Sequence, residues 1–317
     1  MVFTKLVIAG SSGYVADHAI RAILASTEPK FDVTILTRAD SDKTPPSIPG
    51  AKIVPVDYND HSALVRAVSG ADAILSFLSG PAARVVDQLL LKAAQAASVR
   101  RIFPSEYTLD VLHPAAVSLL TEGGDWQEDL SPVVAARKFL ALADEGGPTS
   151  FTTLITSGFI DSWLEGDFGS FDPKNGKVTV VDSGDHYFTG CSLPFLGAAI
   201  VAVLKMDEER TKNKRIHIAE LRATMNQIAD TYDEVTGTKF ERSRVTSQEL
   251  ISQRNASLKA GNAVGAYFGA IHLGAFNGCG AGDLKDGLQF DGDGFLNVRR
   301  KTLKELVVEA VSKVGAA

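Results

Sequence analysis

Short apolar runs alternate with segments of helical spacing through the first half of the chain. Apolar runs rich in Val, Ile and Leu predict strands, and longer segments with apolar residues three and four apart predict helices. The predicted strands are 5–9, 32–37, 52–55, 73–78, 101–104 and 151–155. The predicted helices are 18–26, 61–68, 82–97 and 132–144, with Asp60 as the N-cap of the second. This alternation is typical of a Rossmann-type, doubly wound parallel sheet, so we expect an α/β fold of that class.

The later part of the chain has a different pattern. The predicted strand pieces are 178–181 and 215–218, and the predicted helices are 193–204, 225–235, 248–260 and 304–314. No repeat or low-complexity linker separates the two parts. We therefore expect a Rossmann domain at 1–155 and a smaller α/β region at 156–317, closely packed and interleaved with the first.

The segment 108–131 lies between two predicted elements, and its apolar residues have neither the spacing of a helix nor that of a strand. It contains Gly123, Gly124 and Trp126. A mobile loop beside a binding site and a plain surface excursion are both consistent with this composition.

A glycine turn follows the first predicted strand directly. Gly10, Gly13 and Ala16 have the spacing GxxGxxA, just before the predicted helix. Gly10 allows a tight turn, and Gly13 allows backbone to approach a phosphate at a helix N-terminus. We expect the turn, including Ser12, Tyr14 and Val15, to hold the pyrophosphate of a dinucleotide. An ordinary strand-to-helix turn also uses glycine, so the pattern alone is weak evidence.

The end of the second predicted strand selects between dinucleotides. An NAD site usually has Asp or Glu there, which would repel a phosphorylated ribose. This strand instead ends in Arg38, and Lys43 follows in the loop. Arginine pairs with phosphate through several parallel donors, which favours NADPH. The alternative is a solvent-exposed arginine, and the nearby Asp40 and Asp42 argue against the assignment.

Composition excludes several other functions. The chain has 317 residues, a net charge of -6 and no dense Lys/Arg run, so we expect neither a nucleic-acid partner nor a membrane partner. Two cysteines are typical of a reducing compartment, and we expect a cytoplasmic protein. His186 and His272 have no clustered partners in the sequence, so we expect no metal site. The absence of a GxSxG turn argues against a serine hydrolase.

Several segments together resemble the isoflavone reductase-like family, the NmrA-like branch of atypical short-chain dehydrogenases. They are the glycine turn, ILTR at 35–38, DYNDHSAL at 57–64, ADAILSFLSG at 71–80, RRIFPSEY at 100–107, SGF at 157–159 and TKNKRIHI at 211–218. The resemblance implies hydride transfer from NADPH to an aromatic or conjugated small molecule. It implies that the region 156–317 binds substrate. It also implies that the FPSEY segment, with Pro104, Ser105 and Glu106, lines the cleft, although Thr108 stands where the family often has glycine.

The family's catalytic lysine has two candidate positions here. The resemblance implies a lysine on the helix after FPSEY that binds the nicotinamide ribose and donates a proton. Lys138 is the natural candidate, but an ungapped count from Phe151 puts Arg137 in that position. Neighbouring helical residues point about 100° apart, so only one of the two faces the cleft. A surface lysine is the structural alternative for Lys138.

The remaining candidates follow other predicted strands. Ser79 follows the fourth strand, at an edge where open α/β sheets bind ligands. Tyr107, Phe159 and Trp163 would form a flat apolar substrate pocket, although core packing is the simpler explanation for each of them taken singly. Two other functions stay open: a non-catalytic NADP-binding sensor or regulator, and an isomerase or cyclase without net redox change. We expect a monomer or homodimer.

Overall fold

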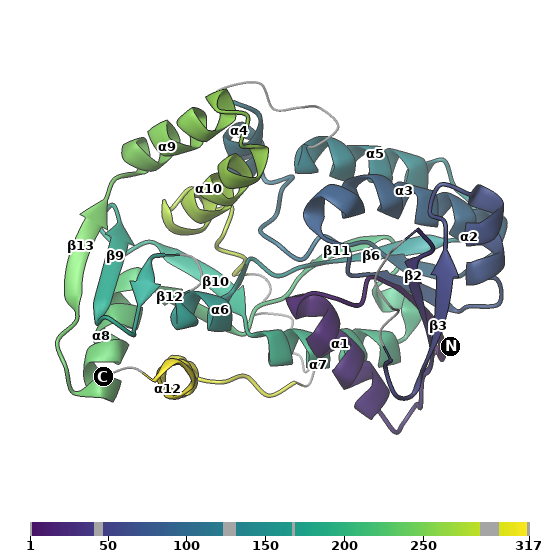
Figure 1. Ribbon diagram of the computed structural model, residues 1–317, viewed down its shortest axis with the longest axis horizontal. Helices are drawn as coiled ribbons and strands as arrows, with labels where there is room; N and C mark the ends of the chain where they lie inside the picture. Colours follow the sequence, from purple (N-terminus) through teal and green to yellow (C-terminus); the bar gives the residue numbers. More distant parts are fainter. Residues whose placement is uncertain (1, 41–46, 123–130, 167–168, 286–297, 316–317) are drawn as a thin grey trace. The chain divides into compact units, whose positions relative to one another are not determined.

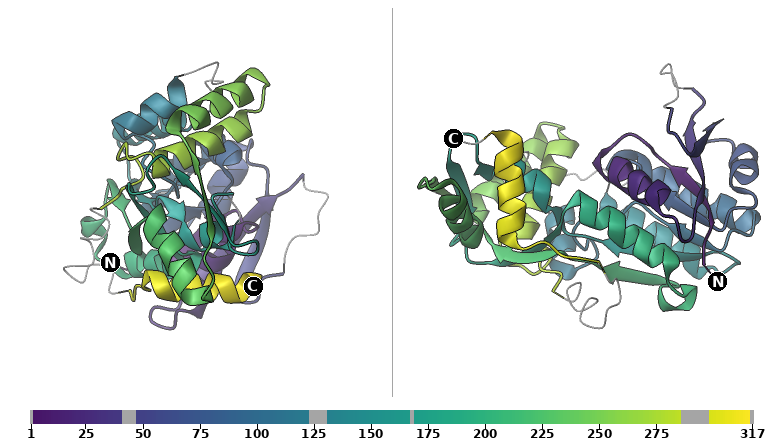
Figure 2. Two further views of the ribbon diagram at one scale, coloured as in Figure 1. Left: turned by 90° about the vertical axis from the view of Figure 1, so that its left-hand side faces the viewer. Right: turned by 90° about the horizontal axis from the view of Figure 1, so that it is seen from below.

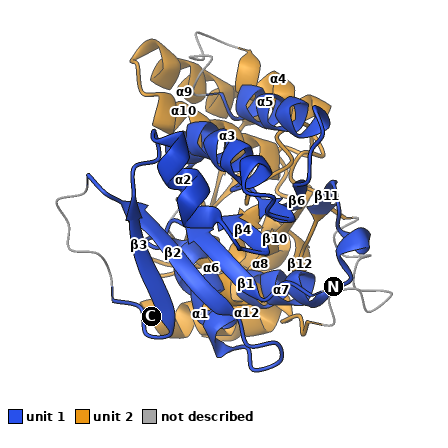
Figure 3. Cartoon of the chain, turned by 90° about the vertical axis from the view of Figure 1, so that its right-hand side faces the viewer, with its two compact units in different colours: residues 1–106, 128–154, 196–216 blue, residues 107–127, 155–195, 217–317 orange. Residues whose placement is uncertain are grey.

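The computed structural model describes residues 2–40, 47–122, 131–166, 169–285 and 298–315. The chain divides into two compact units, each made of three separate stretches of sequence (Figure 3). Unit 1 comprises 1–106, 128–154 and 196–216. Unit 2 comprises 107–127, 155–195 and 217–317.

Unit 1 is built on a seven-stranded sheet (Figure 1). In spatial order its strands are β11 (Lys214–His217), β6 (Ser150–Ile155), β5 (Arg101–Phe103), β4 (Ala73–Ser76), β1 (Lys5–Ala9), β2 (Asp32–Arg38) and β3 (Ala51–Val56). The pairs from β6 across to β3 are all parallel. The chain reverses its direction of travel across the sheet between β1 and β4, which is where doubly wound sheets bind dinucleotides.

Helices cover both faces of this sheet (Figure 3). One face carries α2 (His61–Val68), α3 (Gly80–Ala96) and α5 (Pro132–Asp144), and their apolar side chains share one core with β1 and β4. The other face carries α1 (Tyr14–Ala25) and α7 (Leu193–Lys205), which lie side by side in Figure 2. Because both faces are covered, every residue of β4 is buried. The predicted Rossmann-type parallel sheet is confirmed.

Close packing of α1 against α7 explains a glycine that the sequence left unexplained. A Cβ on Gly197 of α7 would lie 2.8 Å from the carbonyl oxygen of His18 on α1. A real Cβ does not approach that closely, so only glycine permits this distance between the helices. Since α7 and β11 are part of unit 1, the chain returns to the sheet after residue 195. The boundary expected near residue 155 differs from this division.

The returning segment supplies partners to a buried arginine. Arg101 at the start of β5 is 1% exposed. Its guanidinium donates to Ser150 Oγ, Thr152 Oγ1 and Thr211 Oγ1, at 2.7, 2.6 and 2.8 Å, and to the Glu208 carbonyl at 2.8 Å. Burial lowers the pKa of Arg101 to about 10. Two of these four partners come from 196–216, so this segment completes the hydrogen bonding of a buried charge.

Unit 2 contains two three-stranded sheets. One has the order β12 (Leu221–Thr224), β10 (Tyr187–Cys191), β7 (Gly158–Phe159); the other has the order β13 (Glu241–Val245), β9 (Lys177–Val181), β8 (Phe171–Asp172). Its helices are α4 (Pro114–Thr121), α6 (Ile160–Glu165), α8 (Met225–Thr236), α9 (Ser247–Lys259), α10 (Ala263–Phe276) and α12 (Leu303–Val314). A single core joins α6, α8 and α12 to strands of both sheets.

The irregular segment expected at 108–131 contains a helix. His113 caps α4 by accepting the Ala115 N–H at 3.3 Å, and Pro114 occupies its first turn. The segment carrying Gly123, Gly124 and Trp126 lies outside the described residues. Helix α10 is apolar on all sides but spans only Ala263–Phe276. Among the residues that the structure describes, no helix has the length and apolar character needed to cross a bilayer.

Candidate cofactor-binding site

The glycine turn joins β1 to α1 at the carboxyl edge of the sheet. Gly10 has φ +91°, and a Cβ there would lie 2.9 Å from the Phe77 carbonyl carbon and oxygen. Phe77 in turn donates its N–H to the Ala9 carbonyl at 2.8 Å. Gly10 is therefore required both by its backbone conformation and by the close approach of the segment after β4.

The N-terminus of α1 is open. Gly13 is its N-cap, and no side chain caps this end of the helix. A Cβ on Gly13 would meet no atom within 4 Å. Ser12 and Tyr14 are exposed and Val15 is half-buried. Uncapped N–H groups and open space at a helix N-terminus are the features that a phosphate needs, so the turn fits a dinucleotide.

Arg38 lies at the same edge, at the end of the neighbouring strand β2. Its side chain is exposed, and within the described part of the chain it makes no hydrogen bond or ion pair. The guanidinium is therefore available to an anion. Asp40 is exposed two residues later, and the predicted Lys43 contact, like Asp42, falls outside the described residues.

The ends of β4 and β5 are tied to each other. The Ser105 hydroxyl donates to the Leu78 carbonyl at 2.9 Å. Pro104 before it is buried, whereas Ser79 is exposed and caps α3 without a side-chain hydrogen bond. The structure thus brings Ser79 and Ser105 to the edge that also carries the glycine turn. The Ser105 hydroxyl is thus engaged by the backbone of the neighbouring segment, and a contact of Ser105 with a ligand stays a prediction.

Glu106 is also engaged by the protein. Its carboxylate accepts two hydrogen bonds from Arg215 of β11, at 2.6 and 3.2 Å, and both side chains are largely buried. A bidentate pair of this kind fixes the loop after β5 in one orientation. A contact of Glu106 with a ligand stays a prediction.

Arg137 and Lys138 occupy α5. The buried face of this helix is formed by Val133, Ala136 and Phe139. Arg137 and Lys138 are both exposed, at neighbouring positions outside this buried face. Both side chains are exposed alike, so a catalytic role for Lys138 rather than Arg137 stays a prediction.

The three aromatic candidates lie in unit 2 and differ in burial. Tyr107 and Phe159 are half-buried. Trp163 is only 5% exposed, and its ring packs 5.5 Å from Phe188 and 4.7 Å from Phe276. Trp163 therefore has the core position that the sequence offered as the alternative. Its ring also fills the place where Gly158 would carry a Cβ.

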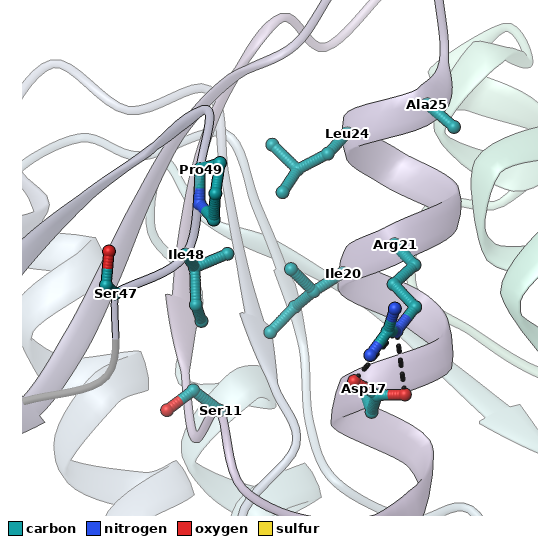
Figure 4. A pocket seen from close by; sticks show the side chains of 9 residues that line it. All are labelled: Ser11, Asp17, Ile20, Arg21, Leu24, Ala25, Ser47, Ile48 and Pro49. Atoms are coloured by element: carbon teal, nitrogen blue, oxygen red, sulfur yellow. Dashed lines mark hydrogen bonds and ion pairs between the residues drawn. The ribbon is translucent and has the colours of Figure 1, made fainter.

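A cavity adjoins the glycine turn (Figure 4). Its volume is about 430 Å³, and it runs along α1, with Ser11 at one end, to the segment before β3. Its walls include Ser11, Ile20, Leu24, Ser47, Ile48 and Pro49, and the ion pair of Asp17 with Arg21 also lines it. Residues 47–49 reach α1 only because the sheet places β3 beside β2, so helical or strand periodicity does not reveal this cavity.

The structure also identifies a buried acid that the sequence did not single out. Asp87 of α3 is 7% exposed and accepts the Ser105 N–H at 2.8 Å. Its position follows from the helix register, but its partner is 18 residues away in the chain.

His272 is the histidine candidate with a side-chain hydrogen bond to a serine. His272 is buried, its Nε2 lies 3.0 Å from Ser170 Oγ, and burial lowers its pKa to about 4. Across the described ranges, no group of three or more His, Cys, Asp or Glu is placed to hold a metal ion.

The chain is similar in sequence to known proteins. The model of the NmrA-like family matches residues 4–119. Bifunctional pinoresinol-lariciresinol reductase 1 of Linum usitatissimum is 26% identical over 264 residues, covering 78% of this chain and 80% of its own. Isoflavone reductase of Cicer arietinum is 24% identical over 277 residues, covering 80% of this chain and 82% of its own.

A solved structure extends the comparison to the whole fold. The complex of leucoanthocyanidin reductase from Vitis vinifera with NADPH has a TM-score of 0.72 to this chain, at 19% identity, and the match covers 97% of this chain and 99% of the other. The resemblance expected from the sequence is thereby confirmed: the chain carries the NmrA-like family match at 4–119 and is similar to the isoflavone reductase-like proteins along most of its length.

Proposed function

We propose that this protein is an NADPH-dependent reductase of an aromatic or conjugated small molecule. The observation that carries the proposal is the open N-terminus of α1 at the carboxyl edge of a doubly wound sheet, together with the exposed Arg38, whose side chain has no partner among the described residues. A pyrophosphate and a ribose 2′-phosphate require these two features. Relatives named as reductases, and a similar structure solved with NADPH, support the same proposal.

The cofactor site proposed here comprises the glycine turn, Arg38 and the ends of β4 and β5. Gly10, Ser12, Gly13, Tyr14 and Val15 would surround the pyrophosphate through backbone N–H groups. Arg38, with Lys43 from the following loop, would hold the 2′-phosphate. Ser79 and the Pro104–Glu106 segment would adjoin the nicotinamide end. NADPH, when bound, supplies two electrons as a hydride and leaves as NADP⁺.

Lys138 would provide the proton that balances this hydride. Its ammonium would bind the nicotinamide ribose and protonate the substrate at the atom that gains negative charge, after which solvent would reprotonate the amine. Arg137 cannot take this role because a guanidinium stays protonated. If Arg137 faces the site, the protein binds the cofactor without a proton donor, as a sensor would.

Unit 2 would supply the substrate region. Of the three aromatic candidates, Tyr107 and Phe159 are half-buried and have area left to contact a flat ligand. Trp163 would act from within the core, by filling the space behind Gly158. The domain assignment of 1–155 to the cofactor and 156–317 to the substrate, a cytoplasmic location and a monomeric or homodimeric state remain predictions.

Turnover of a substrate panel tests the proposal. Loss of NADPH absorbance is followed with enones, quinones and aromatic ketones, and NADPH affinity is measured in parallel by calorimetric titration. A reductase oxidises NADPH with at least one of these classes. Tight binding without oxidation across the panel indicates the sensor, while substrate conversion without NADPH consumption indicates the isomerase or cyclase.

A further inference from the structure

Asp87 is a buried carboxyl that contacts the backbone of the candidate site. It lies in the second turn of α3, and its Oδ2 accepts the N–H of Ser105 at 2.8 Å. Ser105 is thus restrained twice, since its hydroxyl also donates to Leu78. One restraint comes from the helix that follows β4 and the other from the segment that leads into it.

Stability alone does not explain a carboxyl at this position. The Asp87 side chain is 7% exposed, and among the described residues neither its Oδ1 nor the nearby Ser76 hydroxyl has a hydrogen-bond partner of good geometry. Burial raises the pKa of Asp87 to about 7, although the Ser76 hydroxyl and the Ser105 N–H both lower it in part. An apolar side chain would avoid the desolvation cost. What the carboxyl provides is a fixed acceptor for one particular N–H.

We propose that Asp87 is a positioning residue of the cofactor site, holding the Pro104–Glu106 segment against the end of β4 before NADPH binds. The inference rests on the NADPH site proposed above. Asp87 touches neither cofactor nor substrate, and it acts through the Ser105 N–H. Because this segment is preformed, binding does not have to order it, and affinity rises accordingly.

Two substitutions separate the acceptor from the charge. Asp87→Asn keeps the side-chain volume and a carbonyl oxygen that accepts the Ser105 N–H. Asp87→Ala removes the acceptor. Asp72→Ala is the control: the Asp72 carboxylate also accepts backbone N–H groups, those of Thr4 and Lys5 at 2.8 and 2.9 Å, but at the amino end of the sheet.

The readouts are the Kd for NADPH, measured by fluorescence titration of each full-length variant, and amide hydrogen exchange at Ser105 and Glu106. We expect Asp87→Ala to weaken NADPH binding about tenfold, the effect of one charge-assisted hydrogen bond. Exchange at Ser105 should become faster while the amides of β1 stay protected. Asp87→Asn should keep the Kd for NADPH and the Ser105 exchange rate of the wild-type protein. Asp72→Ala should lower stability without changing the Kd.

The outcomes are distinct. A wild-type protein that does not bind NADPH overturns the proposed function and this inference with it. A wild-type protein that binds NADPH, with Asp87→Ala binding equally well, overturns the inference alone. Equal weakening by Asp87→Ala and Asp72→Ala also overturns it, because a general loss of stability then explains the effect.

Discussion

The guanidinium of Arg215 donates to both carboxylate oxygens of Glu106, at 2.6 and 3.2 Å, and so joins β11 to the loop after β5. The exposed fractions of the two side chains are 17% and 15%. Water therefore screens this pair less than it screens an exposed pair, and loss of one partner leaves the other partly desolvated.

We expect Glu106→Gln and Arg215→Met each to lower the free energy of unfolding by about 1–3 kcal/mol. Denaturant unfolding of both single variants and of the double variant should give a coupling energy above ~1 kcal/mol. The pair Lys304–Glu234, exposed by 61% on each side, is the matched control and should couple by less than ~0.5 kcal/mol. Equal coupling in the two pairs would contradict the role given to Glu106.

Gly10 and Gly13 should respond differently to alanine. Gly10→Ala adds a Cβ 2.9 Å from the Phe77 backbone at φ +91°, so it should destabilise unit 1 by ~2 kcal/mol or more. Gly13→Ala meets open space and should change stability little, but its methyl group should weaken NADPH binding. Thermal unfolding and NADPH titration of both variants check this. Unchanged NADPH affinity of Gly13→Ala would remove that residue from the phosphate site.

Arg38 should determine the preference for NADPH. We expect the wild-type protein to bind NADPH at least ~10-fold more tightly than NADH, and Arg38→Ala to abolish that difference with little effect on NADH. Calorimetric titration with both dinucleotides measures it. Lys52→Ala, which removes an exposed positive charge from β3 of the same sheet, is the control and should keep the preference. Equal affinities of the wild-type protein for the two cofactors would exclude the assignment.

Lys138 and Arg137 are compared by the same substitution. Lys138→Ala should lower turnover by a factor of roughly 100 or more, the usual contribution of a positioned proton donor, with NADPH affinity largely retained. Arg137→Ala should keep turnover near that of the wild-type protein. The reverse result would place Arg137 in the site and remove Lys138 from the catalytic role. Steady-state kinetics with a substrate found in the panel provide the measurement.

Asp87 should make stability depend on pH. Its pKa is about 7 in the folded protein against 3.8 for an ordinary aspartate. Between these values the folded state binds more protons than the unfolded state, so stability falls as the pH rises. Relative to Asp87→Asn, the wild-type protein should lose ~2–4 kcal/mol on going from acidic to mildly alkaline solution, at ~1.4 kcal/mol for each pKa unit.

Denaturant unfolding of the wild-type protein and Asp87→Asn at several pH values tests this expectation. The other carboxyl groups titrate in both proteins, so their contributions cancel when the two free energies of unfolding are subtracted at each pH. Burial raises the pKa of Tyr58, and the nearby Asp87 carboxylate adds to that rise, so Tyr58 stays neutral over this pH range. Parallel pH profiles of the two proteins would show that Asp87 does not titrate near neutral pH.

The local sequence pattern was sufficient to predict most strands of the sheet and the helices that cover it. The strand at 5–9 and the helices at 61–68 and 132–144 have the predicted bounds, and Asp60 caps α2 by accepting the Ala63 N–H. These features depend on periodicity and capping within a few residues. Helix α1 begins at Tyr14 rather than at 18, because Gly13 serves as its N-cap.

Partners distant in sequence were beyond the reach of such patterns. The strand near 215–218 was recognised as a strand, but its place beside β6 depends on contacts with residues about 60 positions earlier, such as Phe151 with Asn213. The same holds for the candidate site. FPSEY identifies a segment, but the partners Asp87 and Arg215, which fix Ser105 and Glu106, follow only from the three-dimensional fold.

The return of 196–216 to unit 1 limits where the chain can be divided. A fragment ending at residue 155 would retain the glycine turn and Arg38, yet it would lose β11, the Glu106 partner Arg215 and two of the four acceptors around Arg101. The backbone edge of β6 would also be uncovered, which invites pairing with other chains. Truncation at residue 155, which looks like a simple way to isolate a cofactor-binding half, should therefore yield an aggregating fragment. A fragment that continues through residue 217 retains all seven strands of the sheet.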